Sequence, residues 1–135
     1  MRVLIDTNIL ISAALSEKGT AAKAFYKATE SPYECILCDY CIDEFKRVAR
    51  SRLSKYITNI DAFLASALIS AKIISTPLDE ECVGEEASIR DINDRPIVRA
   101  AINAKIDLIL TGDKDFLQSG LKKPKMVSPA EFLQL

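Results

Sequence analysis

The stretch RVLI at residues 2–5, followed at once by Asp6, decides the predicted fold. Short runs rich in β-branched residues are typical of strands that are buried on both faces of a sheet. Comparable runs recur along the chain and are separated by segments with helical spacing: ECILC (34–38), IIST (73–76), DLIL (107–110) and KMV (125–127). This alternation predicts an α/β protein in which helices cover both faces of a parallel sheet of about five short strands.

The segments between these runs carry helix signals. We expect helices at residues 9–15, 20–30, 40–50, 53–57, 61–71 and 94–105, and a short one after the turn TGDKDF (111–116). Asp39 is placed to cap the third of them, and Thr58 with Asp61 has the spacing of a capping box. Ser128 opens a second capping box, SPAE, before a last helix. Residues 79–94 are acidic, and we expect them to be irregular.

Length and composition limit the possible classes of protein. The chain has 135 residues, of which 49% are hydrophobic and 27% charged, which fits one globular domain over residues 1–135. Its net charge of −1 gives no overall basic field, so contacts with nucleic acid would depend on local patches. The start MRVLID lacks the apolar run of a signal peptide, and no stretch approaches the ~18 apolar residues of a membrane span. We therefore expect a cytosolic protein that does not enter a membrane.

Two acidic residues follow predicted strands. Asp6 comes directly after residues 2–5, and Asp113 follows residues 107–110 after Thr111 and Gly112. Ligands of open parallel sheets bind beyond the carboxyl ends of the strands, and both acids are delivered to that edge. Each of them alone is explained equally well as a helix N-cap.

Two further acids lie on predicted helices. Glu44 falls on the apolar stripe of its helix, whereas its neighbour Asp43 falls on the wet face. Asp94 lies at the start of a later amphipathic helix, on the same side as the apolar stripe of that helix. An inward-facing carboxylate is costly unless it is paired or binds a metal. For Asp94, a buried salt bridge to Arg99 or Arg2 is the alternative to a metal.

The four acids together predict a metal site. Four carboxylates in a chain without histidine make an all-oxygen donor set, which suits Mg²⁺ or Mn²⁺ better than Zn²⁺. A cation held in this way activates water and neutralises charge on a phosphodiester. The lack of histidine excludes the usual base of Ser-His-Asp hydrolysis and the histidine pair of metal-free RNA cleavage. We therefore predict metal-dependent phosphate chemistry at Asp6, Glu44, Asp94 and Asp113.

Several neighbours of these acids are candidates for orienting a carboxylate or contacting a phosphate. They are Thr7, Asn8, Thr111, Gly112 and Asp115. Helix capping explains Thr7 and Asn8 equally well, and the glycine would let backbone approach closely. Asp91 is the main rival of Asp94 as the third metal ligand. The remaining acids of this part of the chain, Glu80, Glu81, Glu85 and Glu86, are interpreted as solvated surface.

A basic stretch begins just after Glu44. It comprises Lys46, Arg47, Arg50, Arg52 and Lys55. Such a run is more often a solvated helix face, but beside an acidic metal centre it would hold the phosphates that flank a scissile bond. Tyr40 and Tyr56 are candidates for stacking on a base.

The four cysteines of the chain offer a second kind of metal site. Cys35, Cys38 and Cys41 recur at a spacing of three, and Cys82 stands alone. Because Cys35 and Cys38 belong to a predicted strand and Cys41 to the next helix, we expect their side chains to diverge, and no fourth ligand completes a zinc or iron–sulfur set. We interpret them as reduced, partly buried structural cysteines.

Three segments carry a resemblance to the PIN-domain nucleases. RVLIDTNILISA (2–13) resembles the family's first strand, with its metal-binding acid at Asp6 and a polar residue at Asn8. DEFKRVARSRL (43–53) resembles the helix of the second acid, at Glu44. DINDRPIVRAAINAKIDLILTGDKDFL (91–117) resembles the segment of the third and fourth acids, at Asp94 and Asp113. The resemblance spans nearly the whole chain, and it places Asp94 ahead of Asp91.

This resemblance implies a three-layer α/β/α fold and Mg²⁺- or Mn²⁺-dependent cleavage of RNA. Many small prokaryotic members are toxins of toxin–antitoxin pairs, similar to the VapC type, so it also implies a cognate antitoxin and a homodimer. Two other functions stay open. One is a non-catalytic RNA- or protein-binding module of the same fold. The other is a phosphatase with Asp6 as nucleophile, although Asn8 stands where such enzymes usually have a second aspartate.

Overall fold

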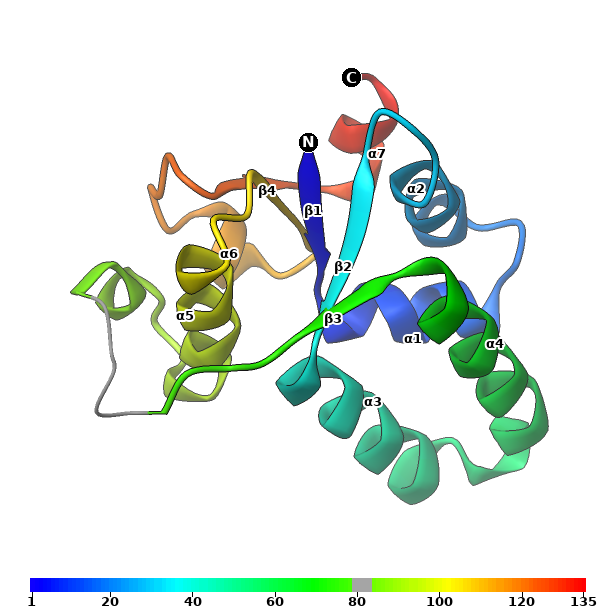
Figure 1. The fold of residues 1–135 in the computed structure, drawn as a ribbon. Helices are drawn as coiled ribbons and strands as arrows, with labels where there is room; N and C mark the ends of the chain where they lie inside the picture. Colours follow the sequence, from blue (N-terminus) through cyan, green and yellow to red (C-terminus); the bar gives the residue numbers. More distant parts are fainter. Residues whose placement is uncertain (79–83) are drawn as a thin grey trace.

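The computed structural model describes residues 1–78 and 84–135, which form one parallel sheet with helices on both sides (Figure 1). The strands are β1 (Arg2–Ile5), β2 (Glu34–Cys38), β3 (Lys72–Ile74), β4 (Leu108–Leu110) and β5 (Lys125–Val127). Their order is β3-β2-β1-β4-β5, and all neighbours pair in parallel. The predicted α/β class and five-stranded parallel sheet are confirmed, with β1 in the centre.

Helices separate into two groups according to the face of the sheet that they cover. The α-helices are α1 (Thr7–Leu15), α2 (Thr20–Ala28), α3 (Asp39–Arg52), α4 (Ile57–Ser70), α5 (Arg95–Asn103), α6 (Lys114–Leu117) and α7 (Pro129–Leu133). Single 3₁₀ turns lie at η1 (Ser54–Tyr56), η3 (Gly84–Ser88) and η4 (Ile92–Asp94). Figure 1 shows α5 and α6 on one side of the strands and α1, α2 and α4 on the other. None of the described helices is both long and apolar enough to cross a membrane.

Alternating side chains of the strands build a separate core on each face. Val3 and Ile5 of β1 belong to one core, which α1, α2, α3, α4 and α7 complete. Leu4 belongs to the other core, which includes Ile97 of α5 and Phe116 of α6. Because β1 is buried on both faces, its carboxyl end emerges between covered layers, and the side chain that follows it is held away from water.

Two predicted helix caps differ in the structure, and α1 begins at Thr7, two residues before its expected start. The helix α3 begins at Asp39 itself, with Cys38 at the N-cap, and the Asp39 carboxylate instead accepts hydrogen bonds from the backbone N–H and hydroxyl of Thr76. The helix α4 begins at Ile57 and has no side-chain cap, so the predicted capping box of Thr58 with Asp61 is wrong. The capping box at Ser128 is confirmed. Apolar packing, which continues through Ile57 and Ile60, overrides the local capping signal in α4.

The cysteines are buried and free, but their predicted divergence is wrong for one pair. Cys35, Cys38 and Cys41 carry free thiols in the core. Cys35 faces the core of α1 and α2, whereas Cys38 and Cys41 both face the core of α5, where their sulfur atoms lie 3.2 Å apart. The turn from β2 into α3 brings these two side chains back together. Cys82 lies outside the described residues, as do Glu80 and Glu81.

Glu86 is not solvated surface, contrary to the prediction. It is 8% exposed, and its carboxylate receives two hydrogen bonds, of 2.8 and 3.1 Å, from the guanidinium of Arg99, which is 5% exposed. Arg99 also donates to the carbonyl oxygen of Pro77 at 3.0 Å. The 3₁₀ turn η3 therefore packs onto α5, and the ion pair fixes it against that helix.

This buried ion pair generates a prediction about stability. Replacing Arg99 by alanine leaves the Glu86 carboxylate buried without its main counter-charge, so we expect the free energy of unfolding in urea to fall by about 3 kcal/mol or more. Arg90 is the matched control, because its ion pair with Asp115, at 3.2 Å, involves an arginine side chain that is 86% exposed. The Arg90→Ala change should cost less than about 1 kcal/mol. Equal losses in the two variants would contradict the structural role of the Glu86–Arg99 pair.

Candidate functional site

The carboxyl end of β1 places Asp6 in a buried position. Asp6 is 3% exposed, and its backbone N–H donates to the carbonyl oxygen of Leu110 at 3.0 Å, which holds it against β4. It occupies the N-cap position of α1, but its side chain makes no capping hydrogen bond. Its Oδ2 instead accepts a hydrogen bond of 2.8 Å from the hydroxyl of Thr111. Helix capping therefore does not account for this carboxylate.

Thr111 links Asp6 to the second strand-end acid. Its Oγ1 donates to Asp6 and accepts from the backbone N–H of Asp113 at 3.0 Å. The Asp113 carboxylate accepts a hydrogen bond of 2.8 Å from the N–H of Asp115, so it does cap α6. That cap occupies Oδ1 and leaves Oδ2 available to a cation. The two strand-end acids are thus held by one short chain of hydrogen bonds that runs through a threonine hydroxyl.

The two helical acids approach from α3 and from the start of α5. Glu44 lies on α3 with its side chain 25% exposed, and its nearest ion pair, with Arg47, is a loose 3.9 Å. Asp94 is half-buried at the N-cap of α5 but makes no capping hydrogen bond. Neither salt bridge considered for Asp94 forms, because Arg99 pairs with Glu86 and Arg2 with Glu34. The Asp94 carboxylate therefore has no cationic partner among the described residues.

Electrostatic interactions connect all four acids. Burial raises the pKa of Asp6, which is about 6 in the folded protein. The hydrogen bonds of Asp6 oppose this shift, whereas the negative charges of Glu44 and Asp113 add to it. Burial likewise raises the pKa of Asp94 to about 7, and the charges of Asp113, Asp6, Asp91 and Glu44 add to this effect. The acids therefore act on one another as repulsive negative charges. A cation among them would reverse the sign of these effects.

The donors fit a hard divalent cation, although their side chains stand apart. Among residues 1–78 and 84–135, no three carboxylate or thiol side chains are grouped closely enough to hold a metal ion. Beside Asp6, the buried hydroxyl of Thr7 makes no hydrogen bond of standard geometry with the described residues, although the Cys41 thiol lies near it. An all-oxygen donor set with an unpaired Asp94 carboxylate fits Mg²⁺ or Mn²⁺.

The remaining candidate residues differ in the contacts that they make. Asp91 is exposed and caps η4 by accepting from the backbone N–H of Asn93 at 2.9 Å, so its geometry favours Asp94 as the ligand. Asp115 pairs with Arg90. Asn8 is exposed at the start of α1. A Cβ built on Gly112 would meet no atom within 4 Å, so no contact inside the protein requires glycine there.

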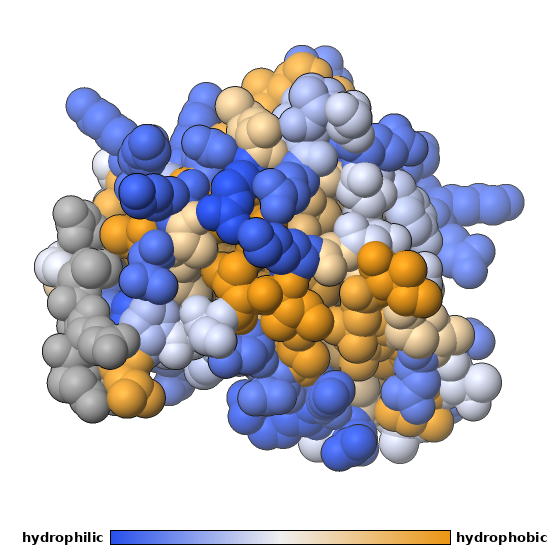
Figure 2. All heavy atoms as spheres, in the orientation of Figure 1, coloured by the Kyte–Doolittle hydropathy of each residue, from blue (hydrophilic) through white to orange (hydrophobic). Residues whose placement is uncertain are grey.

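The predicted basic stretch forms an exposed face of α3. Lys46, Arg47 and Arg50 line a shallow hollow together with Asp43 and Ser51. Arg52 is also exposed, near the end of the helix. Figure 2 shows hydrophilic residues gathered over α3, at the bottom of the view. Glu44 belongs to the same helix, so α3 carries both this basic face and one of the four acids.

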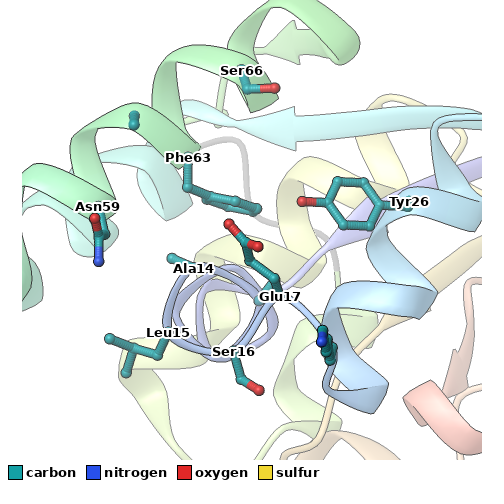
Figure 3. A pocket seen from close by; sticks show the side chains of 11 residues that line it. Ala14, Leu15, Ser16, Glu17, Tyr26, Asn59, Phe63 and Ser66 are labelled. Carbon is teal, nitrogen blue, oxygen red and sulfur yellow. The ribbon is translucent and has the colours of Figure 1, made fainter.

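Two cavities lie at different distances from the acids. One of about 380 Å³ is lined by Tyr40, Asn93 and Arg95, the last two of which flank Asp94 in the chain. Another of about 680 Å³ lies between the end of α1, α2 and α4, where Glu17, Tyr26 and Phe63 face it (Figure 3). None of the four acids lines the second cavity. None of the four acids lines the smaller cavity either, but its residues Asn93 and Arg95 are the chain neighbours of Asp94.

Comparison with known proteins identifies the family. A profile of the PIN domain family matches residues 2–115, a range that contains all four acids. The chain belongs to the PIN domain family. A search of curated protein sequences found no significant match.

Two solved structures share this PIN domain fold. One is the crystal structure of VapBC2 from Rickettsia felis bound to a DNA fragment from its promoter, in which a chain matches with a TM-score of 0.69 and 16% identity, over 95% of this chain and 98% of that one. The other is PAE2754 from Pyrobaculum aerophilum, with a TM-score of 0.68 and 15% identity, over 100% of this chain and 91% of that one. At such low identity these matches support the fold alone.

Burial of Asp6 generates a prediction about pH. Because its pKa is raised in the folded PIN domain, folding favours the neutral form, and stability is lost as the pH rises from about 4 through about 6. An Asp6→Asn change keeps an acceptor for Thr111 and removes the charge. In the presence of a chelator at pH 8, we expect this variant to unfold at a higher temperature than wild type. Its unfolding free energy should be larger by up to about 3 kcal/mol. Near pH 4 the two proteins should be equally stable.

The control for this measurement is Asp43→Asn, which changes an exposed aspartate of α3. Its melting temperature should follow that of wild type across the same pH range. If Asp6→Asn were less stable than wild type by the same amount at pH 4 and pH 8, the buried charge would not be what limits stability.

Proposed function

We propose that this PIN domain is a metal-dependent endoribonuclease that acts as the toxin of a toxin–antitoxin pair. The observation that carries the proposal is the mutual electrostatic coupling of Asp6, Glu44, Asp94 and Asp113, which come from three strand or helix ends and from α3. A bound Mg²⁺ or Mn²⁺ would supply activated water and neutralise the phosphodiester charge. We assign these four acids as the ligands of that cation.

The chain's own residues have distinct tasks in this mechanism. Thr111 orients the Asp6 carboxylate, and the cap made by Asp115 orients that of Asp113. Both are therefore held in place before a substrate arrives, which is the arrangement that metal-assisted catalysis needs. Thr7 offers a hydroxyl next to Asp6, and Asn8 an exposed amide. We propose that these two groups contact the scissile phosphate or its bound water.

The surroundings of the acids support an RNA strand as substrate. We propose that the basic face of α3, with Lys46, Arg47, Arg50 and Arg52, holds phosphates on one side of the scissile bond. The cavity beside Asp94 has room for a nucleotide, and Tyr40 presents an aromatic ring there, although its hydroxyl donates to the backbone of Asn93. In this arrangement, the RNA strand would run from the basic face of α3 past the metal site to this cavity. A net charge of −1 makes such local binding sites necessary.

The proposed partners follow from the family and from the fold match. VapBC2 of Rickettsia felis contains a protein of this fold in a complex bound to promoter DNA. By analogy we propose that this chain forms a homodimer in the cytoplasm and is restrained by a small antitoxin protein. A non-catalytic binding module is the alternative, and metal binding separates the two functions.

Metal binding is the first test. Titration of the protein with Mn²⁺ in a calorimeter should give a saturable signal, and Glu44→Gln should weaken the affinity by at least about tenfold because a negative donor is lost. Asp43→Asn is the matched control, since it removes the same charge one residue away on the exposed face of α3. Equal affinities in all three proteins would mean that Glu44 is not a ligand, and absence of any binding would favour the non-catalytic module.

Cleavage of RNA is the second test. With Mg²⁺ or Mn²⁺, wild type should produce fragments with 5′-phosphate and 3′-hydroxyl ends, because metal-held water attacks in line. Asp6→Asn should reduce the rate by more than about a hundredfold without loss of fold, and chelation should silence wild type reversibly. Undiminished cleavage by a folded Asp6→Asn protein would reject the site, and covalent labelling of Asp6 by a phosphate donor would favour the phosphatase.

A further inference from the structure

The junction between β2 and α3 holds a pair of thiols that the proposed nuclease mechanism does not use. Cys38 is the N-cap of α3 and Cys41 lies in its first turn, so the sequence CDYC (38–41) spans the strand end and the helix start. Their sulfur atoms lie 3.2 Å apart and share a hydrogen bond. Two cysteines at this spacing, with the first at a helix N-terminus, have the geometry of dithiols that exchange with disulfides.

The contacts of Cys38 favour it as the attacking sulfur. Its neighbours, the thiol and the backbone N–H of Cys41, lower its pKa, against the raising effect of burial. Cys38 is therefore the first to ionise and to attack. The Cys41 sulfur lies 3.2 Å from that of Cys38, which places it to attack in the second, resolving step.

Cys38 is fully buried, at 0% exposure. Thr76 lies next to it and is held there by hydrogen bonds from its hydroxyl and N–H to the Asp39 carboxylate, of 2.6 and 2.9 Å. Asp39 is exposed and Thr76 partly so. Oxidation of Cys38 therefore requires a local opening of the structure that exposes its sulfur.

We propose that Cys38 and Cys41 are a redox-active dithiol, which a small-molecule disulfide oxidises reversibly to an intrachain disulfide. The Cys38 thiolate attacks one sulfur of the small disulfide and releases the other half as a thiol. Cys41 then attacks the Cys38 sulfur of the mixed disulfide and releases the second half. The protein loses two hydrogen atoms, and one small disulfide becomes two thiols. The sulfur atoms need to approach by about 1 Å for the bond to form.

The position of this pair gives it access to the metal site. Cys41 lies close enough to Asp6 and Thr7 for both to affect its pKa, and it is one helical turn before Glu44. The disulfide would therefore form directly beneath the acids assigned to the metal. The dithiol itself does not depend on the nuclease proposal, because its formation is read from thiols and not from RNA.

The test is equilibration of the folded, metal-free protein in buffers of increasing ratio of oxidised to reduced glutathione, followed by alkylation and mass analysis. We expect the loss of two alkylatable thiols per chain and a disulfide-linked peptide that joins Cys38 to Cys41, both reversed by dithiothreitol. Cys35→Ser is the matched control, because Cys35 lies three residues before Cys38 but on the opposite face of the sheet, where burial raises its pKa to about 12. This variant should oxidise as wild type does.

Each alternative result has a defined meaning. Cys38→Ser and Cys41→Ser should each abolish the loss of the thiol pair; if either variant misfolds, the peptide map of wild type and the Cys35→Ser result decide the question. Retention of all thiols by the folded wild-type protein at every glutathione ratio would overturn the proposal. So would a disulfide that involves Cys35 or Cys82, or a mixed disulfide with glutathione that never resolves.

Discussion

The burial of one carboxylate at the end of the central strand is the constraint on which the rest of the site depends. β1 is covered on both faces, so Asp6 cannot reach water, and the shift of its pKa from 3.8 to about 6 corresponds to about 3 kcal/mol at neutral pH. This cost is a large fraction of the 5–15 kcal/mol by which domains are typically stable. A chain retains such a cost where the charge is needed, and the charges of Glu44 and Asp113 add to it. The sheet thus holds an electrostatic field that favours a cation at its carboxyl edge.

Thr111 shows how the fold holds this repulsive arrangement in place. Its hydroxyl donates to Asp6 and accepts from the backbone of Asp113, so one side chain fixes the spacing of two like charges. The N-cap and ligand interpretations of Asp113 are also compatible. A carboxylate has two oxygens, and the cap of α6 uses only Oδ1. Capping therefore orients the group that the proposed metal site requires.

How far the sequence predicts this structure depends on the range of the interactions involved. Local patterns predict the strands and their parallel arrangement. They also predict the positions of Asp6 and Asp113, because a residue that follows a buried parallel strand lies at the carboxyl edge of the sheet. Glu44 follows from helical periodicity. The Glu86–Arg99 pair does not, because it depends on how an irregular acidic segment folds back onto α5. The contact between Cys38 and Cys41 escapes prediction for a related reason: strand and helix periodicities each describe one element, and the turn between the two reorients the side chains. The helix α4 starts earlier than expected because of tertiary packing, which capping rules do not describe.

The two pairs of acids differ in how much freedom they have. Asp6 and Asp113 are fixed by hydrogen bonds at the ends of adjacent strands, whereas Glu44 and Asp94 project from helices with partly exposed side chains and no firm partner. In the proposed metal site, the second pair therefore has more freedom than the first to adjust to a cation. Rotation of a half-exposed side chain costs at most about 2 kcal/mol of conformational freedom, far less than moving the end of a central strand. Asp94 stands on α5, whose position against η3 depends on the buried Arg99–Glu86 pair. That ion pair therefore helps to position the helix whose N-terminus carries Asp94.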